Sequence, residues 1–131
     1  MNILVAYDGS DVAKDALQLA QKRAKIWQAE INVVRHLDQS REIGYEEIHK
    51  AEDQLHKEVR AFLKDENDSF RTHLLVSSLT AGEEIVEFAA RIHADEIVVG
   101  VRRRSRVGKL FFGSTAQYIV LNAPCPVVTI K

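Results

Sequence analysis

Short apolar runs alternate with longer amphipathic segments along the whole chain. The runs are rich in valine, isoleucine and leucine, and they fall at residues 2–7, 31–37, 73–77, 96–100 and 127–130. Apolar runs of this length are typical of strands that are buried on both faces of a parallel sheet. The pattern therefore predicts five strands.

Between these runs, apolar residues recur every three or four positions, as they do on the buried face of a helix. The first helix is expected to begin near Ser10, and the second to end by Asn67. Thr80–Glu83 and Ser114–Gln117 both match the capping-box pattern, which predicts the starts of the third and fourth helices. The buried stripes are formed by Ala13, Ala16, Leu17, Ala20, Ala24 and Trp27; by Ile48, Ala51, Leu55, Val59 and Phe62; by Ile85, Phe88, Ala89 and Ile92; and by Ile119 and Val120.

This alternation of strands and helices predicts an α/β protein whose parallel sheet has helices on both faces. Ligands bind such sheets beyond the carboxyl ends of the strands, where the strand order reverses. Asp8 follows the first strand and residues 101–113 follow the fourth, so both are expected at that edge. The length of 131 residues suits one domain, and we expect residues 1–131 to form a single domain.

Charge is distributed unevenly. The chain has a net charge of −1, yet residues 101–113 contain no acid and five cationic side chains. Because the positive charge is confined to one short segment, it indicates a small anionic ligand rather than nucleic acid. The single cysteine and the lack of a secretory leader or a membrane-length apolar run predict a cytoplasmic protein. The five cations are Arg102, Arg103, Arg104, Arg106 and Lys109.

This basic stretch lies between a strand and the start of a helix. Backbone N–H groups at a helix N-terminus have no partner within the helix, and the helix dipole adds partial positive charge there. Proteins bind phosphate groups with this arrangement. The sequence therefore predicts an anion site, and a nucleotide is the ligand that it favours.

Two segments resemble the universal stress protein family, and the resemblance extends over the whole length. They are Ile-Leu-Val-Ala-Tyr-Asp8-Gly-Ser10 and Gly113-Ser114-Thr-Ala with the later Ala-Pro124-Cys-Pro-Val-Val. The resemblance implies an open five-stranded parallel sheet in the order 3-2-1-4-5, which is Rossmann-like and similar to the adenine nucleotide alpha hydrolase fold. Its nucleotide-binding branch carries G-x2-G-x9-G-[ST]. Gly100, Gly113 and Ser114 match this motif, but Arg103 replaces the middle glycine.

By this resemblance, the ligand is an adenine nucleotide such as ATP, and Asp8 could help to hold Mg²⁺ through the phosphates. One group of residues would contact the adenine and ribose, and another the sugar and phosphates. The first group is Ala6, Tyr7, Asp8 and Leu37, with Leu37 as an apolar wall for the base; the second is Val99, Gly100, Arg102, Arg103, Lys109, Gly113, Ser114 and Thr115.

Several alternatives remain open. Arg103 could direct two donors onto phosphate oxygens, or it could fill the site and neutralise Asp8. Asp8 could also serve only to form the turn before the first helix. The protein would then be an ATP-binding stress protein that acts through ligand-dependent conformation or partner choice, a homodimer that binds no nucleotide, or a very slow ATP hydrolase.

The C-terminal residues Pro126–Lys131 are expected to form an edge strand. Because exposed apolar edges favour pairing with another chain, a homodimer is predicted here, and proline at Val128 is expected to weaken it. Members of the family commonly pair through this edge. Cys125 is interpreted as a small buried filler, since no histidine and aspartate partner is evident for it.

Overall fold

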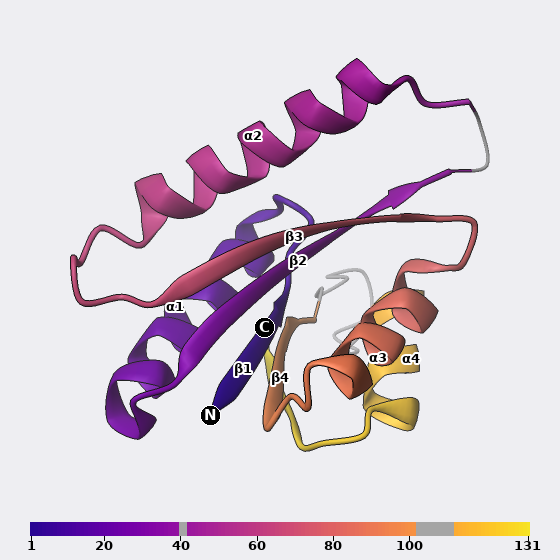
Figure 1. Cartoon of the computed structure of the whole chain (residues 1–131). Helices are drawn as coiled ribbons and strands as arrows, with labels where there is room; N and C mark the ends of the chain where they lie inside the picture. Colours follow the sequence, from indigo (N-terminus) through magenta and orange to yellow (C-terminus); the bar gives the residue numbers. More distant parts are fainter. Residues whose placement is uncertain (40–41, 102–111) are drawn as a thin grey trace.

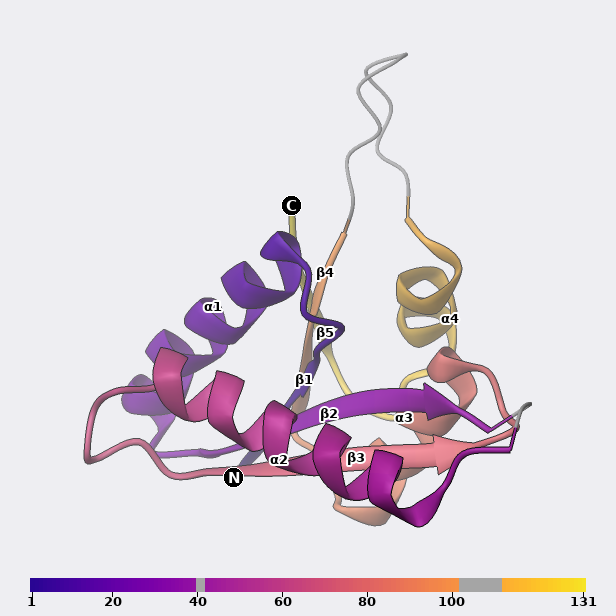
Figure 2. The same cartoon turned by 90° about the horizontal axis from the view of Figure 1, so that it is seen from above.

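A computed structural model of the chain describes residues 1–39, 42–101 and 112–131, and Figures 1 and 2 show how its elements are arranged. Strands and helices alternate through these ranges, as the hydrophobic pattern predicts. The elements are β1 (Asn2–Ala6), α1 (Asp11–Trp27), β2 (Glu30–Asp38), α2 (Tyr45–Phe62), β3 (Phe70–Ser77), α3 (Ala81–Arg91), β4 (Glu96–Gly100), α4 (Ser114–Asn122) and β5 (Val127–Ile130).

The strands form one parallel sheet in the order β3-β2-β1-β4-β5, which confirms the predicted fold class and strand order. From β1 the chain proceeds outward through β2 to β3, and it then returns to the other side of β1 for β4 and β5. The strand order therefore reverses between β1 and β4. β5 is an edge strand, as the sequence predicts.

Helices cover both faces of the sheet. α1 and α2 pack on one face, where Leu17, Leu55 and Val59 join the core. α3 and α4 pack on the other face with Ile85 and Ile119, and Figure 2 shows the two pairs of helices on opposite sides. Successive residues of β1 alternate between these two cores. This double burial explains why the strands are apolar without polar alternation.

The alanines of α1 allow the helix to lie close to the sheet, since Ala13, Ala16 and Ala20 are almost fully buried. The helix begins as predicted, because the Ser10 hydroxyl oxygen accepts a hydrogen bond from the Ala13 N–H at 3.2 Å. The prediction that Trp27 continues the buried stripe is wrong. Trp27 is the last residue of the helix and remains 57% exposed.

The other two predicted helix starts have different outcomes. Thr80 caps α3 and accepts a hydrogen bond from the Glu83 N–H at 3.3 Å, which confirms the predicted helix start; the Glu83 carboxylate accepts from the Thr80 hydroxyl at 3.1 Å. The second is wrong, because the N-cap of α4 is Gly113, which has no side chain with which to cap the helix. Ser114 already has helical backbone and cannot act as the cap. Val120, which was expected to face inward, is 44% exposed.

β3 begins earlier than the apolar run predicts. Its register with β2 pairs Phe70 with Ile31, and the pairing continues to Ser77 opposite Asp38. Cross-strand pairing therefore extends the strand over residues 70–72, where the hydrophobic pattern alone is weak.

Candidate functional site

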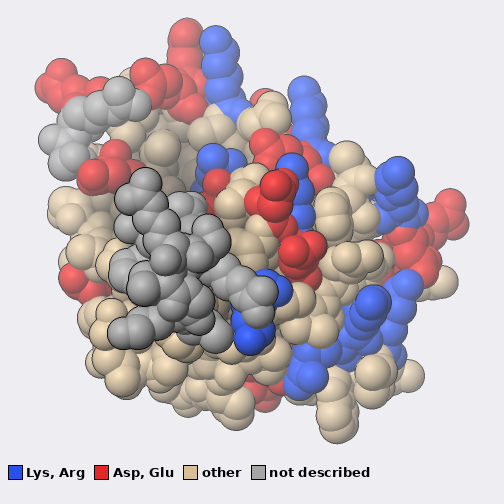
Figure 3. Space-filling view, turned by 180° about the vertical axis from the view of Figure 1, so that it is seen from behind, with Lys and Arg blue, Asp and Glu red and all other residues tan. Residues whose placement is uncertain are grey.

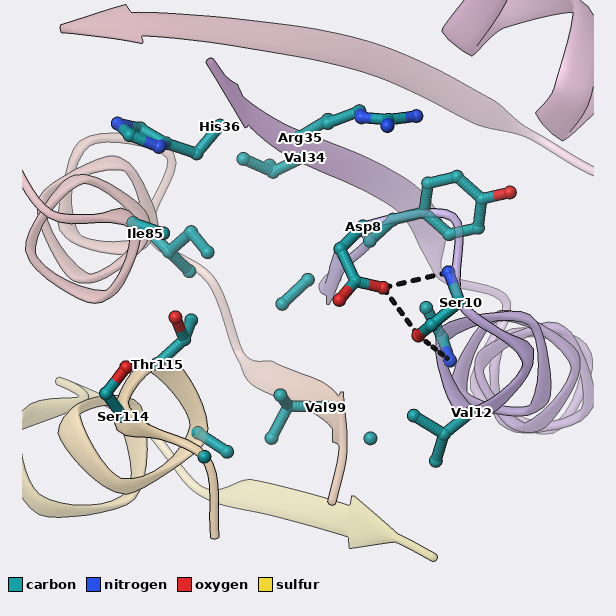
Figure 4. A pocket seen from close by; sticks show the side chains of 17 residues that line it. Asp8, Ser10, Val12, Val34, Arg35, His36, Ile85, Val99, Ser114 and Thr115 are labelled. Atoms are coloured by element: carbon teal, nitrogen blue, oxygen red, sulfur yellow. Dashed lines mark hydrogen bonds between the residues drawn. The ribbon is translucent and has the colours of Figure 1, made fainter. Parts of the chain in front are cut away.

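A cavity of about 510 Å³ lies at the carboxyl edge of the sheet, at the switch point between β1 and β4 (Figure 4). Its walls come from the β1–α1 connection, the ends of β2 and β4, and the starts of α3 and α4. This volume lies within the range of about 300–1,000 Å³ that small-molecule sites occupy. The position is the one at which open parallel sheets bind ligands.

The cavity brings together most of the residues that the sequence nominates. Leu37 does not line it, whereas the preceding residues of the strand, Val34, Arg35 and His36, do. Arg102, Arg103 and Lys109 lie outside the described residues, so their roles stay predictions. The nominated residues that line the cavity are Ala6, Tyr7, Asp8, Val99, Gly100, Gly113, Ser114 and Thr115.

Asp8 and Ser10 organise the turn between β1 and α1. The Asp8 Oδ1 atom accepts hydrogen bonds from the Ser10 N–H at 3.0 Å and from the Ser10 hydroxyl at 2.5 Å (Figure 4). Gly9 between them has φ of +84°, a left-handed conformation that glycine adopts without strain. Asp8 thus forms the turn and also places its carboxylate in the wall of the cavity.

Tyr7 fixes the back of this wall to α2. Its hydroxyl donates to Glu58 Oε2 at 2.9 Å, and Arg35 Nη1 lies 3.9 Å from the same oxygen. Burial, followed by the bond to Glu58, raises the pKa of Tyr7 to about 12. A hydrogen bond from Gln54 is the largest cause that lowers the pKa of Glu58. The phenol therefore stays protonated at neutral pH and has a structural role.

Gly100 lies at the point where β4 passes the start of α1. A Cβ atom there would lie 2.8 Å from both Cγ2 and the carbonyl oxygen of Val12. Because real Cβ atoms do not approach so closely, the position excludes a side chain. The first glycine of the motif is therefore required by protein packing, whatever the cavity binds.

Gly113, Ser114 and Thr115 form the opposite wall, at the start of α4 (Figure 4). The N-cap residue Gly113 has no side chain to cap the first turn, so within the described residues no such bond satisfies the leading N–H groups at the cavity. A Cβ at Gly113 would meet no atom of residues 1–39, 42–101 or 112–131 within 4 Å. This wall therefore combines open space, backbone donors, two hydroxyl groups and the positive end of a helix dipole.

Arg35 and His36 line the cavity from the end of β2, and the sequence analysis did not nominate either. The alternation along β2 offered a usable indication, because His36 shares a face with Val34, which belongs to the core under α3. Nε2 of His36 is buried and has no hydrogen-bond partner. The β2–α3 side is otherwise apolar, with Val34, Ala81 and Ile85.

Other chemistry is weakly represented in the described ranges. They contain no cluster of three or more His, Cys, Asp or Glu side chains that could hold a metal ion. Burial raises the pKa of the Cys125 thiol, which disfavours the thiolate that a nucleophile requires. None of the helices in these ranges has the length and hydropathy needed to span a bilayer.

The fold and the cavity define the class of this protein: a doubly wound, Rossmann-like α/β protein with a cavity at the switch point of its sheet. The model of the universal stress protein family matches residues 1–131. The chain belongs to the universal stress protein family.

Relatives support this assignment over nearly the full length. A universal stress protein of Thermus aquaticus is 36% identical, with 98% of this chain and 97% of the relative covered. A solved universal stress protein from Archaeoglobus fulgidus has a TM-score of 0.85 at 36% identity, with 100% of this chain and 98% of that chain covered. Another structure from Archaeoglobus fulgidus, a complex with dAMP, has a TM-score of 0.81 at 32% identity and the same coverage.

Proposed function

We propose that residues 1–131 form one domain that binds an adenine nucleotide in the switch-point cavity. The observation that carries this proposal is the uncapped start of α4, which forms one wall of a cavity whose β2–α3 side is largely apolar. One wall suits phosphate and the other suits a flat base. The dAMP bound by a relative of 32% identity supports the proposal. In the cell, this would be a cytoplasmic stress-response protein that acts through ligand-dependent conformation or partner binding.

The phosphates would lie against Gly113, Ser114 and Thr115. The backbone N–H groups of the first turn donate to phosphate oxygens, and the two hydroxyl groups add donors. The cationic side chains of Arg102, Arg103 and Lys109 would strengthen this attraction. Their contribution rests on the sequence.

ATP with Mg²⁺ is the form of the ligand that we propose. Mg²⁺ is held by few protein oxygens together with phosphate oxygens, so a single carboxylate is sufficient. Asp8 fits this requirement, because it lines the cavity and Ser10 holds its Oδ1 atom in place. The ion would then neutralise phosphate charge beside the Asp8 carboxylate.

Calorimetric titration of nucleotide-stripped protein tests the proposal. AMP, ADP and ATP are added with and without Mg²⁺, at low and at moderate salt. Micromolar binding that weakens with salt is expected, because much of the attraction is between charges. If no nucleotide produces heat or raises the melting temperature, the cavity does not bind nucleotides and the proposal is wrong.

A small ligand also agrees with the surface charge. On the face opposite to the view of Figure 1, Asp and Glu are interspersed with Lys and Arg over the parts drawn in colour, and several Lys and Arg gather at the lower right (Figure 3). Nucleic-acid interfaces usually present a basic patch or stripe. Apart from that cluster, the coloured parts of this face carry both signs of charge, which supports a nucleotide over a polynucleotide as the ligand.

We also propose that the protein forms a homodimer through β5. Ile97 N–H donates to the Pro126 carbonyl and Val101 N–H donates to the Ile130 carbonyl, so residues 126, 128 and 130 direct their backbone groups toward β4. In a parallel ladder the intervening residues, Val127 and Thr129, direct theirs to the open edge. The edge is therefore available for pairing with a second copy.

The register decides which variant tests the dimer. Val128→Pro would also break the pairing of β4 with β5, whereas Thr129→Pro removes a donor only from the open edge. Sedimentation of the wild type is expected to show a dimer at micromolar concentration, and Thr129→Pro a monomer with a similar unfolding midpoint. A monomeric wild type would contradict the proposal.

A further inference from the structure

The outer edge of β3 has no partner strand in the described part of the chain. β3 ends the sheet on the side of β2 (Figure 2). The Ile31 N–H donates to the Ser69 carbonyl and the Gln39 N–H to the Ser77 carbonyl, so the odd-numbered residues of β3 direct their backbone groups toward β2. The residues that direct their backbone groups outward are therefore Phe70, Thr72, Leu74 and Val76.

This edge lacks the features that usually keep an edge strand from pairing, which are short length, charged residues, prolines and bulges. Its register with β2 continues without a bulge over eight residue pairs, whereas β5 at the other edge has four residues. Residues 72–77 include no proline, lysine, arginine or acidic residue. Leu74 and Val76 are only partly buried and pack against neither core. The edge is thus suited to pairing with another strand.

The flank of α3 gives the carboxyl end of this edge a negative charge. The Ser77 hydroxyl, at the end of β3, donates a hydrogen bond to the Glu84 carboxylate. Glu87 follows Glu84 by one helical turn, and its side chain is exposed. Two carboxylates therefore lie on the α3 side of the strand, toward its carboxyl end.

The opposite end of the same flank is positive. The ring of Phe88 lies 4.7 Å from that of His73, and the Arg91 guanidinium lies over the Phe88 ring at 5.4 Å, one turn further toward the amino end of β3. Arg71 of β3 is near this end, and its side chain is 70% exposed although it pairs with Glu30 at 3.1 Å. The edge therefore has opposite charges at its two ends.

A second copy of the chain has the charges that complement this edge. In an antiparallel pair related by a two-fold axis, the amino end of each strand lies beside the carboxyl end of the other. Arg71 and Arg91 of one copy would then lie beside Glu84 and Glu87 of the other, whereas a parallel pair would bring like charges together. We propose that the outer edge of β3 pairs in this antiparallel manner with a second copy, about an axis near Leu74.

This contact is distinct from the proposed pairing through β5, which is at the opposite edge of the sheet. It involves one strand edge and a few side chains, so it should bury less than the roughly 1,600 Å² of a standard interface. A dissociation constant of about 0.1–1 mM is expected for such a contact. Molecules joined through β5 would then associate further, through β3, only at high protein concentration.

A charge-exchange experiment tests the proposal. Thr129→Pro serves as the background, because it removes the β5 contact, and Arg71→Glu and Glu87→Arg are each added to it. Sedimentation at about 1 mM should show that the background protein dimerises and that each added substitution weakens the dimer about tenfold. An equimolar mixture of the two charge variants should dimerise again, since both contacts of the two-fold pair then join opposite charges. Lys22→Glu, an exposed position on α1, is the control and should change nothing.

Hydrogen exchange of the wild type provides a second measurement that needs no variant. Raising the concentration to about 1 mM should protect the amides of Thr72, Leu74 and Val76, because a dissociation constant in this range makes the paired form abundant. The amides of His73 and Leu75 already face β2 and should not change. Thermal unfolding checks that each charge variant folds.

Three results would overturn the inference: a background protein that stays monomeric at this concentration, a mixture that fails to associate, or single charge variants that associate as well as the background. Unchanged exchange of the outward amides would also contradict it. No nucleotide enters these experiments, and the β5 contact is tested separately at micromolar concentration. Failure of this inference is therefore distinguishable from failure of either proposed function.

Discussion

Gly100 and Gly113 bracket the basic stretch of the chain, and their surroundings differ completely. At Gly100, the side chain and carbonyl oxygen of Val12 lie within 3 Å of where a Cβ would be. At Gly113, no atom of the described residues lies within 4 Å of that position, and φ of −55° is accessible to any residue. Packing between β4 and α1 thus requires glycine at position 100. Packing among the described residues gives no reason for glycine at position 113.

This difference extends to the walls that the two glycines belong to. On the Gly100 side, Asp8 is bonded to Ser10 and Tyr7 to Glu58, so the polar groups have partners within the protein. On the Gly113 side, the N-cap residue has no side chain to bond the first turn of α4. Residues of one sequence motif can therefore serve different purposes: one wall holds the fold together, and the other leaves donors for a ligand.

The largest effect is expected from Gly100→Ala. Its methyl group would overlap Val12, and overpacking of this kind costs about 1–3 kcal/mol of unfolding free energy. Val12→Ala should recover part of the loss but not all, because the Val12 carbonyl oxygen is equally close. Urea unfolding measures both. Unchanged stability of Gly100→Ala would mean that β4 and α1 separate easily. The contrast between a glycine required by packing at position 100 and one that is not at position 113 would then be wrong.

Gly113→Leu should instead reduce nucleotide affinity by at least about tenfold, because its side chain would occupy the space beside the donors of α4. Gly44 offers a matched control, since it is the N-cap of α2, has no side-chain cap bond and also has nothing within 4 Å of a Cβ. Both leucine variants lose the glycine cap preference, about 1 kcal/mol. Titration with AMP should therefore distinguish them, although their unfolding midpoints are similar. Equal affinities would contradict a ligand role for Gly113.

Tyr7→Phe tests the packed wall with a smaller change. The substitution removes the hydrogen bond from Tyr7 to Glu58. Because Gln54 and Arg35 still lie beside the Glu58 carboxylate, we expect the unfolding free energy to fall by only about 1 kcal/mol. Nucleotide affinity should be unchanged. Tyr118→Phe, in α4, where the ring packs against Gly82 of α3 and the residue is 37% exposed, is the control and should alter neither quantity. A large loss of affinity in Tyr7→Phe would show that the hydroxyl serves the ligand.

His73 offers the smallest effect and contrasts with His36, since Asn32 and the ring of Phe88 surround it. Burial, followed by the charge of Arg71, lowers the pKa of His73 below 6.5, and Glu30 partly opposes this. The unfolded chain therefore binds the proton more readily, so stability falls as the pH drops below about 6.5 and toward the lowered value. Urea unfolding at pH 7 and pH 5 should show a smaller acid loss in His73→Gln than in the wild type. An equal loss would assign the acid sensitivity to other groups.

Most of the fold could be predicted from local patterns. The apolar runs located every strand, and Ser10 and Thr80 marked two helix starts, because strand burial and side-chain capping depend on residues close in sequence. The predictions for Trp27 and Ser114 were wrong. Trp27 is the last residue of α1 and Ser114 is the first residue of α4. Hydrophobic periodicity does not locate a helix end to within one residue, so it could not decide either position.

The sequence by itself determined the class of fold, the family, and eight of the residues that line the cavity, since these follow from element order and a motif of fixed spacing. The tertiary structure alone decided that Val12 excludes a side chain at Gly100, that Glu58 holds Tyr7, and that His36 lines the cavity while Leu37 does not. The first two depend on contacts between residues of different elements. The third depends on which residues at the end of β2 border the cavity, and all three arise only when the chain packs.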